Sequence, residues 1–492
     1  MLASELFSYI RIKEISGNID GIEITQLSQD NRQVGQNTAF ICIKGSQVDG
    51  HDFVESAKEN GAVLFVASED ISEKAGDLPV VYVKDTAKVM ARLADVFYDF
   101  PSEKLYMVGI TGTNGKTTTA HLIEHIFEKC GFSTGIMGTI GHRIGKIKIP
   151  TKNTTPDALT LQGILRKMID ERCDSCVMEV SSHAIALDRV LGCNFDCAIF
   201  TNLTHEHLEL HKTMENYAHT KQRLFLEQGH SLKNSQFKAA VINVDDKYGR
   251  DFAAETVSEL ITYSLKDENA DFFARELKFE ADSTKFVLVF SGKKYDVKTN
   301  LIGEFNVYNL LAAIAGAFAR GIAVEKAIEA VADFGGVDGR MQRIETGREY
   351  SVIVDFAHTP DGLENALGTL NKLPHKNIIT VIGHSGGNRD SSMRPELGKI
   401  ALENSERVIF TADNPRHEKI EDIVEGLISA CPNENYIVIE KREEAIKAAF
   451  DMASEGDIVL LAGKGGEPYQ VIGDEYIPYD EAEVAKKLLN LN

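Results

Sequence analysis

Residues 106–129 read YMVGITGTNGKTTTAHLIEHIFEK and join an apolar run to a glycine-rich turn and then to a helical pattern. In that pattern Leu122, Ile123, Ile126 and Phe127 recur at the spacing of one helical face. The glycine-rich turn would direct backbone N–H groups and the positive end of the helix dipole toward phosphate oxygens. The stretch therefore predicts a strand, a phosphate-binding loop and a helix, in that order.

The turn itself departs from the general phosphate-loop pattern at one position. In that pattern Lys116 reaches the β- and γ-phosphates and Thr117 offers its hydroxyl to magnesium, but position 110 should be glycine and is Ile110. A chance glycine-rich turn is the alternative, and the strand before it and the helix after it argue against that. Such a loop indicates a nucleoside triphosphate and leaves kinases, motor proteins, GTPases and ligases open.

The rest of the chain alternates between strand-like and helical runs. Two apolar runs after the loop, 176–180 and 197–200, end in polar residues, as strands do at the ligand edge of a doubly wound α/β sheet. A second α/β pattern begins after about residue 345. Its strand-like runs are 351–355, 378–382, 407–410, 436–439 and 457–461, and its helical runs are 361–373, 420–430 and 443–453. Before the loop, shorter runs end at a polar break over 101–103, which predicts a linker.

Length and composition are those of a globular protein of about three domains. The chain has 492 residues, at roughly 150 per domain, and 43% of them are hydrophobic. With 53 basic and 74 acidic residues, its net charge of −21 repels nucleic acid and anionic membranes, so we expect neither as a partner. The longest apolar run, 310–319, is shorter than the ~18 residues that span a bilayer and predicts a buried helix. We expect a cytoplasmic protein.

Polar clusters follow both strands beyond the loop. In EVSSH, residues 179–183, the carboxylate of Glu179 suits magnesium, and the serines would equally cap a helix. NLTHEHLELH, residues 202–211, holds three histidines and two glutamates, but alternate residues cannot share one helical face and no cysteine assists, which disfavours zinc. We expect one histidine to meet magnesium and the others to face solvent. By its helical pattern alone, Lys221 is a surface lysine.

Four clusters follow strands of the last domain and should therefore share one sheet edge. They are DFAHTPD (355–361), GHSGGNRD (383–390), DNPR (413–416) and GKGGE (463–467). The cations among them are Arg389, Arg416 and Lys464, and two acids are Asp413 and Glu467. Guanidinium groups grip carboxylates and acids grip ammonium, so this mixture suits a zwitterionic ligand.

Taken together, these motifs resemble those of the Mur ligases. The residues that carry the resemblance are GTNGKTTT, EVSSHA, NLTHEHL, LIGEFNVYN (301–309), GRMQRIE (339–345), DFAHTPD and DNPR, with DNR (30–32) and DGH (49–51) near the N-terminus. The resemblance covers essentially the whole chain. It implies three α/β domains: 1–102 for a UDP-linked substrate, 103–338 with the phosphate loop for ATP, and a Rossmann-like 339–492 for an amino acid.

The resemblance also implies the reaction. A Mur ligase of this type uses ATP and Mg²⁺ to add a third residue, meso-diaminopimelate first among the candidates, to UDP-N-acetylmuramoyl-L-alanyl-D-glutamate in peptidoglycan synthesis, and we expect a monomer. An acyl phosphate would be the intermediate. Alternatives within the fold are L-lysine, a sulfur-bridged diamino acid or a folate-type substrate. The alternative from another class is a kinase or regulatory NTPase whose turnover needs no amino acid.

Family roles fall on positions of this chain as follows. The ATP side comprises Gly112, Thr113, Asn114, Gly115, Lys116, Thr117, Thr118, Asn306, Arg340, Asp355 and His358. The metal ligands would be Thr117, Glu179, His207 and Lys221, and the catalytic set Lys116, Glu179, His207 and Lys221, where the family carries a carbamylated lysine at position 221. Matching the UDP-substrate positions are Asn31, Asn153, Thr154, Thr155, Ser182 and Arg189, and matching the amino-acid pocket are Arg389, Asp413, Asn414, Arg416, Gly463 and Glu467.

This chain differs from the family pattern at a few of these motifs. Glu206 replaces an aspartate, Phe356 a tyrosine and Asn31 a serine, while the runs HSGGNRD and KGGE replace CGGDRD-like and KGHE runs. These differences leave the phosphate chemistry intact and bear on the acceptor amino acid.

Overall fold

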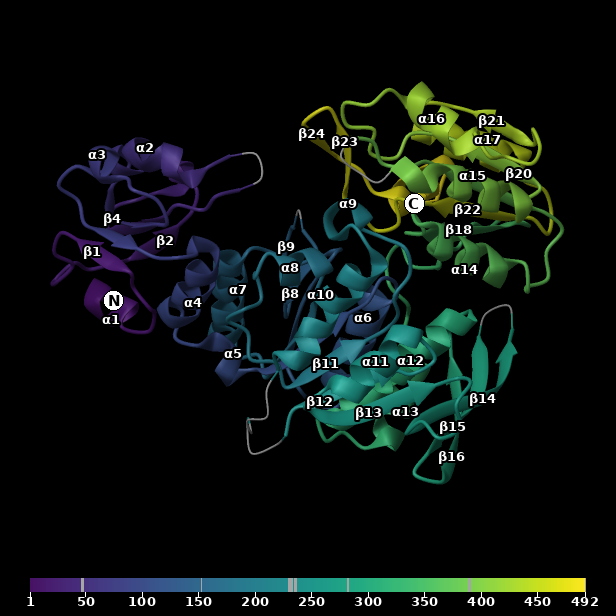
Figure 1. Cartoon of the computed structure of the whole chain (residues 1–492). Coiled ribbons are helices and arrows are strands. Elements are labelled where there is room, and N and C mark those ends of the chain that lie inside the picture. The colour runs from purple at the N-terminus through teal and green to yellow at the C-terminus, as the bar shows by residue number, and fades with distance from the viewer. Residues whose placement is uncertain are drawn as a thin grey trace.

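The computed structural model describes residues 1–45, 48–151, 153–228, 233, 237–280, 283–387 and 391–491. Its strands form three large sheets that follow one another along the chain, and a short hairpin near the C-terminus (Figure 1). We call them the N-terminal, central and C-terminal sheets. The expectation of an α/β fold with a central phosphate-loop part and a Rossmann-like C-terminal part is confirmed.

The N-terminal sheet has the order β1-β5-β4-β3-β2 and is parallel except at β1. The strand-like runs 38–43, 63–66 and 80–83 and the helical runs 52–60 and 87–98 of the sequence coincide with elements of this part to within a few residues, and the remaining elements were not predicted. The strands are β1 (Glu14–Ser16), β2 (Gln26–Ser28), β3 (Thr38–Ile41), β4 (Ala62–Ala67) and β5 (Val80–Tyr82), and the helices are α1 (Ala3–Phe7), α2 (Val54–Glu59), α3 (Ser72–Ala75) and α4 (Thr86–Phe97).

The predicted linker at 101–103 is wrong, because these residues form the short helix α5 (Pro101–Lys104). Proline suits the first turn of a helix, where its missing N–H is not needed. Ser102 is buried, and its hydroxyl accepts a hydrogen bond from the Asn194 N–H (3.1 Å). The Lys233 ammonium donates to the Ser102 carbonyl (2.6 Å). This segment is therefore fixed to the central sheet.

The central sheet has the order β16-β15-β14-β13-β12-β11-β6-β10-β7-β8-β9. The predicted neighbours of the phosphate loop are confirmed, because β6 (Tyr106–Thr111) lies in parallel between β10 (Ser175–Glu179) and β11 (Cys197–Phe200). The sequence did not indicate the antiparallel additions at either end. The other strands are β7 (Thr134–Gly138), β8 (Gly141–Ile144), β9 (Ile147–Ile149), β12 (Ala239–Asn243), β13 (Glu259–Ser264), β14 (Phe272–Phe279), β15 (Thr284–Phe290) and β16 (Lys293–Thr299).

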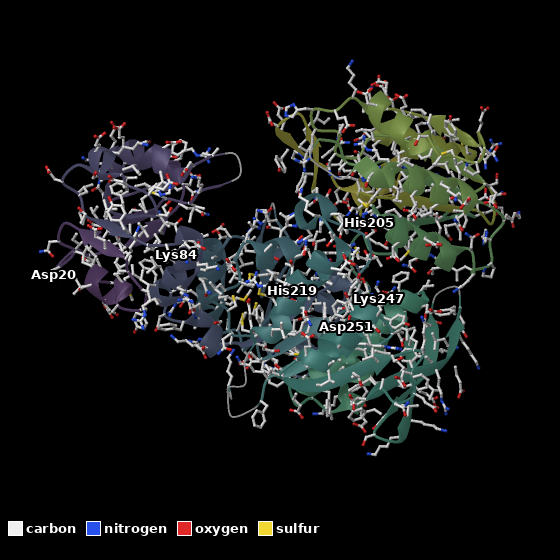
Figure 2. All side chains as sticks on the ribbon, in the orientation of Figure 1. Asp20, Lys84, His205, His219, Lys247 and Asp251 are labelled. Carbon is white, nitrogen blue, oxygen red and sulfur yellow. The ribbon has the colours of Figure 1, made fainter. Side chains whose placement is uncertain are left out.

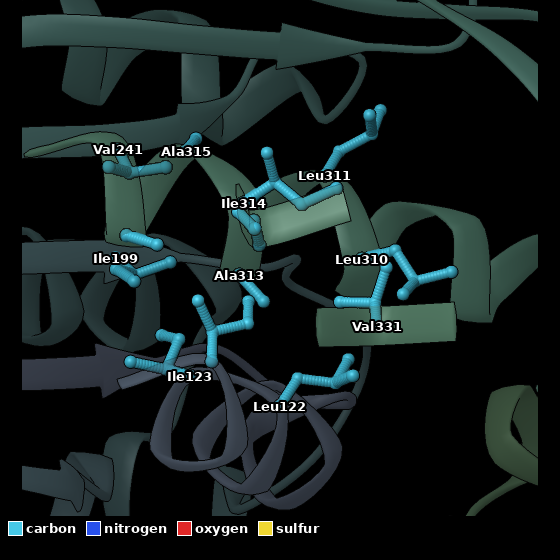
Figure 3. Packing of buried hydrophobic residues seen from close by; sticks show 14 of the residues in the cluster. Leu122, Ile123, Ile199, Val241, Leu310, Leu311, Ala313, Ile314, Ala315 and Val331 are labelled. Atoms are coloured by element: carbon cyan, nitrogen blue, oxygen red, sulfur yellow. The ribbon is translucent and has the colours of Figure 1, made fainter. Parts of the chain in front are cut away.

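Helices cover both faces of the central sheet. One face packs against the helix that follows the phosphate loop and against the predicted buried helix, where Ile123, Ile199 and Ile314 meet (Figure 3). The opposite face forms a second core around Met107, Leu165 and Tyr217. The helices are α6 (Lys116–Lys129), α7 (Ala158–Asp170), α8 (Ser182–Ala186), α9 (Leu208–His211), α10 (Met214–Leu226), α11 (Lys247–Glu255), α12 (Glu304–Ala319) and α13 (Val324–Ala332).

The C-terminal sheet has the order β17-β18-β22-β19-β20-β21 and is parallel except at β17. Its strands are β17 (Gln342–Ile344), β18 (Ser351–Asp355), β19 (Ile378–Ile382), β20 (Arg407–Phe410), β21 (Tyr436–Val438) and β22 (Ile458–Ala462), followed by the hairpin β23 (Tyr469–Ile472) and β24 (Glu475–Pro478). Its helices are α14 (Pro360–Leu370), α15 (Arg394–Glu403), α16 (Ile420–Ile428), α17 (Arg442–Met452) and α18 (Glu481–Leu488).

Two findings bear on the chain as a whole. Among the described residues, none of the helices combines the length and apolar character needed to cross a lipid bilayer.

All seven cysteines are free thiols. Cys173 and Cys176 have the CxxC spacing of redox motifs, yet both are buried, and burial raises the pKa of each thiol. Their environment is that of core residues and not of reactive thiolates.

Replacing Ile314 tests the core beneath the phosphate loop. Ile314→Ala should lower the free energy of unfolding by about 2–5 kcal/mol, because this fully buried side chain fills the space between α12, α6 and the sheet. Leu260→Ala in the same sheet is the matched control, since Leu260 is 39% exposed and a surface change costs about 0.5 kcal/mol or less. The chain contains no tryptophan, so denaturant unfolding is followed by circular dichroism. Equal midpoint shifts for the two variants would contradict this packing.

Candidate active site

A cavity of about 720 Å³ lies where the central sheet meets the C-terminal sheet. Its wall combines the phosphate loop, the ends of β10 and β11, the start of α12 and the loops after β18 and β22. Of the residues that sequence analysis singled out, those that line the cavity are Thr113, Asn114, Gly115, Lys116, Thr117, Thr118, Asn153, Thr154, Thr155, Glu179, Arg189, His207, Asn306, Arg340, Asp355, His358 and Glu467.

The phosphate loop is held against the segment that follows β11. Gly112 has a φ of +148°, and a Cβ there would lie 1.9 Å from the Thr201 hydroxyl, so no other residue fits. The N–H of Thr113 donates to the Asn202 carbonyl (2.8 Å), and that of Asn114 to the Asn202 side-chain oxygen (2.9 Å). The loop therefore has a fixed shape at the N-terminus of α6, which suits phosphate binding.

Lys116 lies over this loop and is half-buried. Its ammonium donates to the carbonyl oxygens of Gly112 (2.8 Å) and Thr113 (2.6 Å). Burial lowers the pKa of Lys116, while the negative charges of Glu206 and Glu179 act against that shift. The side chain is therefore available to an anion at the loop, because it is held there by neutral carbonyl groups.

Thr117, Glu179 and Arg340 converge beside the loop. Glu179 is buried, and its carboxylate accepts hydrogen bonds from the Thr117 hydroxyl (3.1 Å) and from the N–H of Thr139 (2.8 Å). The Arg340 guanidinium donates to the Thr117 hydroxyl (3.0 Å). A hydroxyl and a carboxylate are oxygen donors of the kind that Mg²⁺ takes together with phosphate oxygens and water, so the residues present fit that ion.

A second bond joins the C-terminal part of the chain to the phosphate loop. The side-chain amide of Asn114 donates to the carboxylate of Asp361 (2.6 Å), which lies in the first turn of α14. Burial raises the pKa of Asp361, whereas this hydrogen bond lowers it, and the net shift is upward.

Glu206 is a buried carboxylate between two histidines. Its Oε1 lies 3.5 Å from Nε2 of His207 and 3.5 Å from Nε2 of His358. Burial alone would raise the pKa of Glu206, but His207, His358 and Lys116 together hold it well below its usual range. This residue therefore carries a negative charge at the cavity wall.

The helical pattern placed Lys221 on the surface, and that prediction is wrong. Lys221 is 1% exposed, and its ammonium donates to the Gly112 carbonyl (2.8 Å) and lies 4.8 Å from the centre of the Tyr217 ring. Burial, reinforced by the charge of Lys116, lowers the pKa of Lys221 far below its usual value. The core around Gly112 and Tyr217 therefore disfavours the charged form of Lys221.

The other residues expected on the ATP side are ordered by contacts with nearby groups. Asn306 donates to the Ile302 carbonyl (2.8 Å), and Asp355 accepts from the N–H groups of Met341 (2.7 Å) and Ala357 (2.9 Å). The ring of His358 lies 2.9 Å from the Phe356 carbonyl, and the Arg340 guanidinium is 4.2 Å from the centre of the Phe356 ring. Phenylalanine at position 356 thus supplies the face on which Arg340 rests.

The positions expected for the UDP substrate divide into two groups. Arg189 donates to the Thr155 carbonyl (2.9 Å) beside the cavity, and the Thr155 hydroxyl donates to the Glu179 carbonyl (2.8 Å). Ser182 is buried behind the wall, with its hydroxyl 3.0 Å from Nε2 of His211. Asn31 lies on the N-terminal part, where its side chain donates to the Ser56 hydroxyl (3.0 Å), and does not line the cavity.

The four clusters of the last domain share one sheet edge, as predicted, because they follow the parallel strands β18, β19, β20 and β22. Lys464 was expected among the ligand-binding cations but is fully buried. Its ammonium lies 2.7 Å from Glu467, 3.1 Å from the Asn414 side-chain oxygen and 3.7 Å from Asp413. Asn414 therefore uses its side-chain polar atoms within this internal network, whereas Asp413 accepts a hydrogen bond from the Ser385 hydroxyl (2.9 Å).

Arg416 and Gly463 are positioned by backbone contacts. The Arg416 N–H donates to the Val471 carbonyl (3.1 Å) and its carbonyl accepts from Gly473 (2.8 Å), which ties the loop after β20 to the hairpin. The Gly463 N–H donates to the Asp355 carbonyl (3.1 Å). Arg389 lies outside the described residues.

Sequence reasoning missed a buried ion pair beneath these loops. Arg442, at the start of α17, forms hydrogen bonds with Glu481 (2.6 and 2.9 Å), and both side chains are at most 1% exposed. The guanidinium also donates to the carbonyls of Ala412 (3.3 Å) and Ala462 (2.8 Å), which immediately precede Asp413 and Gly463. Nothing in the local sequence marks a lone arginine followed by two glutamates as buried.

Removing one charge of this pair should destabilise the C-terminal part. Glu481→Gln should lower the free energy of unfolding by about 3–5 kcal/mol, because Arg442 would keep its buried charge without a counter-ion. Glu483→Gln in the same helix is the control, since the Glu483 side chain is 67% exposed. Guanidinium denaturation measures both variants. A Glu481→Gln midpoint equal to that of the parent protein would contradict the pair's burial.

Comparison with known proteins agrees with this geometry. Residues 23–98 match the description "Mur ligase family, catalytic domain", residues 110–317 "Mur ligase middle domain", and residues 339–465 "Mur ligase, glutamate ligase domain". Among curated proteins, the chain is 45% identical over 466 residues to UDP-N-acetylmuramoyl-L-alanyl-D-glutamate–2,6-diaminopimelate ligase of Listeria monocytogenes serovar 1/2a, covering 94% of each chain. Its identity to the protein of the same name in Lactiplantibacillus plantarum is 43%, covering 100% of this chain and 99% of that one.

Solved structures lead to the same family. A structure titled UDP-N-acetylmuramoyl-L-alanyl-D-glutamate–2,6-diaminopimelate ligase superposes with a TM-score of 0.68 at 31% identity, covering 99% of this chain and 98% of that one. The MurF ligase of Thermotoga maritima, solved with ADP, has a TM-score of 0.66 at 18% identity over 94% and 96% of the chains and shows the shared fold. On these matches, the chain belongs to the Mur ligase family.

Proposed function

We propose that the protein is an ATP-dependent ligase that adds meso-diaminopimelate to UDP-N-acetylmuramoyl-L-alanyl-D-glutamate during peptidoglycan synthesis. The observation that carries this proposal is one cavity in which the phosphate loop, an acidic metal position and a loop from the amino-acid side meet. The names and the 41–45% identities of its curated relatives support the substrate assignment. L-Lysine or another diamino acid remains the second candidate for the acceptor.

The chemistry requires activation, because a carboxylate is a poor electrophile. The terminal phosphoryl group of ATP passes to an oxygen of the D-glutamyl carboxylate, which releases ADP and gives an acyl phosphate. The amine of the incoming amino acid attacks the carbonyl carbon, the C–O bond to phosphate breaks, and the nitrogen loses a proton. The products are an amide, ADP and phosphate.

The residues of the phosphate loop serve the first step. Backbone N–H groups of 112–118 and the ammonium of Lys116 would hold the phosphate oxygens, and Lys116 would offset the charge that develops during transfer. Thr117 and Glu179 would hold Mg²⁺, which neutralises phosphate charge when bound. Asn306, Arg340, Asp355 and His358 would orient the nucleotide, and His207 would lie on the metal side.

The two substrates would approach from opposite sides of this loop. Thr154, Thr155 and Arg189, together with Asn153 and Ser182, would orient the muramoyl dipeptide, whose uridine end would extend to Asn31 on the N-terminal part. On the amino-acid side, Arg416 would form a forked pair with the distal carboxylate that lysine lacks. Glu467, Gly463 and Arg389 would hold the amino-acid head, and Asp413 and Asn414 would position Lys464 and Glu467.

We further propose that each part has a main role, 1–102 for the UDP substrate, 103–338 for ATP and 339–492 for the amino acid, and that residues of neighbouring parts complete each site. ATP and UDP-linked precursors are cytoplasmic metabolites, so we place the reaction in the cytoplasm. We also propose that the protein acts as a monomer. Loss of the reaction would affect cell shape and division through the wall.

Carbamylation of Lys221 is part of the proposal. Burial lowers the pKa of Lys221, which favours the uncharged amine, the form that adds to CO₂. The carbamate carries a negative charge, so modification would place a counter-charge for Lys116 on the side chain of Lys221. Lys221 is buried in contact with the Gly112 carbonyl, and this position supports a structural role in which the carbamate balances positive charge at the loop.

The acceptor is tested by phosphate release from ATP with the UDP-dipeptide present and the amino acid varied. Turnover should need both substrates, with meso-diaminopimelate used in preference to L-lysine. Arg416→Ala should raise the KM for diaminopimelate by about 10- to 150-fold, the equivalent of ~1.5–3 kcal/mol for a charged hydrogen bond. His417→Ala is the control, because His417 is an exposed neighbour. ATP turnover that ignores the amino acid would instead favour a kinase or regulatory NTPase.

The state of Lys221 is tested by chemical rescue. Lys221→Ala should abolish ligation, and short carboxylic acids should restore part of it by supplying the missing negative charge. Carbon-13 bicarbonate should give a carbamate signal in the parent protein that is absent from the variant. Rescue by amines in place of acids would overturn the carbamylation.

A further inference from the structure

Three side chains outside the proposed magnesium position gather at the cavity wall. His183, His207 and Glu209 each offer one donor atom, and these atoms all lie within 4.8 Å of one another. His183 belongs to α8, whereas His207 immediately precedes α9 and Glu209 lies in its first turn. The group therefore joins the EVSSH and NLTHEHLELH clusters, which sequence analysis treated as separate.

Backbone geometry explains how alternate residues come together. His207 has a φ of +58°, so the chain turns sharply before α9. As a result, Nδ1 of His207 lies 3.4 Å from Oε1 of Glu209. The argument that alternate residues cannot share a face holds within a helix but not across this turn.

The surroundings of His207 resemble those of a metal-bound imidazole. Its ring lies 4.6 Å from the ring of His183, nearly at right angles to it. While Nδ1 faces Glu209, Nε2 lies 3.5 Å from the buried carboxylate of Glu206. Metal-ligating histidines commonly donate their second ring N–H to such a carboxylate, which orients the ring and raises its basicity.

Neighbouring histidines do not belong to this group. His211 was expected to face solvent, but it is buried, with Nε2 3.0 Å from the Ser182 hydroxyl and Nδ1 3.4 Å from that of Thr220. Its ring stacks on Tyr217. His205 and His219 are exposed and are labelled in Figure 2. His205 was expected among the solvent-facing histidines, and this is confirmed.

We propose that His183, His207 and Glu209 form a binding site for a divalent transition-metal ion of the zinc class. Two imidazoles and one carboxylate, with water in the fourth position, are a ligand set typical of Zn²⁺, whereas Mg²⁺ prefers oxygen ligands. Tetrahedral ligand atoms about 2.0–2.2 Å from one ion lie roughly 3.3–3.6 Å apart. The donor atoms here lie within 4.8 Å of one another, so side-chain rotations must bring them closer to close the site. The inference goes beyond the proposed function and does not depend on it.

The site has a consequence for the proposed ligase, because His207 belongs to both. His183 and His207 line the cavity, so an ion can reach them from solvent. Zinc bound at this site would hold His207 beside Glu209 and withdraw it from the nucleotide metal. Zinc is therefore expected to inhibit turnover in competition with Mg²⁺.

Isothermal titration of the full-length protein with Zn²⁺ alone tests the site. His183→Asn and Glu209→Gln should each weaken binding at least about 10-fold, since even second-layer changes cost that much. His205→Asn and His219→Asn are matched controls and should bind as the parent does. Circular dichroism checks that each variant is folded. The Glu209 side chain is 35% exposed, so Glu209→Gln should disturb the fold less than His183→Asn.

Cobalt as a spectroscopic probe separates this site from the seven cysteines. Co²⁺ at the proposed site should lack the intense absorption of a cobalt–thiolate bond. A thiolate band, or parent-like zinc affinity in both His183→Asn and Glu209→Gln, would overturn the site.

Inhibition is measured separately, as zinc-dependent loss of diaminopimelate-dependent phosphate release. The zinc concentration for half inhibition should rise in Glu209→Gln, and an unchanged value would overturn the competition for His207. If the parent binds zinc but shows no ligase turnover, the site stands and the proposed function fails.

Discussion

Gly112 has no room for a side chain, and much of the site follows from that close approach. Because the backbone of the phosphate loop rests directly on Thr201, the loop is fixed relative to both β6 and the segment after β11. The Gly112 carbonyl accepts hydrogen bonds from two lysines, Lys116 and Lys221. The depressed pKa values of these lysines, and with them the charge balance around the phosphates, depend on this one crowded turn.

How much of the molecule the sequence predicts depends on whether the signal is local. Apolar runs and the glycine-rich turn placed β6, α6, β18 and β19 within a residue or two, since burial on both faces leaves an unambiguous pattern. The antiparallel strands β14–β16 alternate between buried and exposed residues and gave no signal that sequence reasoning used. Pro101 was interpreted as a break, although proline also begins helices.

Residues of the candidate site show the same division. Thr117 and Glu179, both expected among the metal ligands, lie in hydrogen-bond contact, because the loop after β6 meets the end of the adjacent parallel strand β10. Lys221 was misplaced by helical pattern alone, since periodicity does not reveal a polar residue that points into the core. The internal roles of Lys464 and Arg442 were missed for a similar reason. The partners of Lys464 are Glu467 and Asn414, the partner of Arg442 is Glu481, and only the fold brings each pair together.

The bonds from Arg340 to Thr117 and from Asn114 to Asp361 have a thermodynamic consequence. Both cross from the C-terminal part to the phosphate loop, and the first occupies the hydroxyl that the nucleotide's metal would need. A metal–nucleotide complex at the proposed site would therefore compete with a contact that helps dock the two parts. By reciprocity, a ligand that loosens these contacts and the nucleotide would change each other's affinity by the same factor. Occupation of the phosphate loop would thus be coupled to the docking of the C-terminal part on the central part.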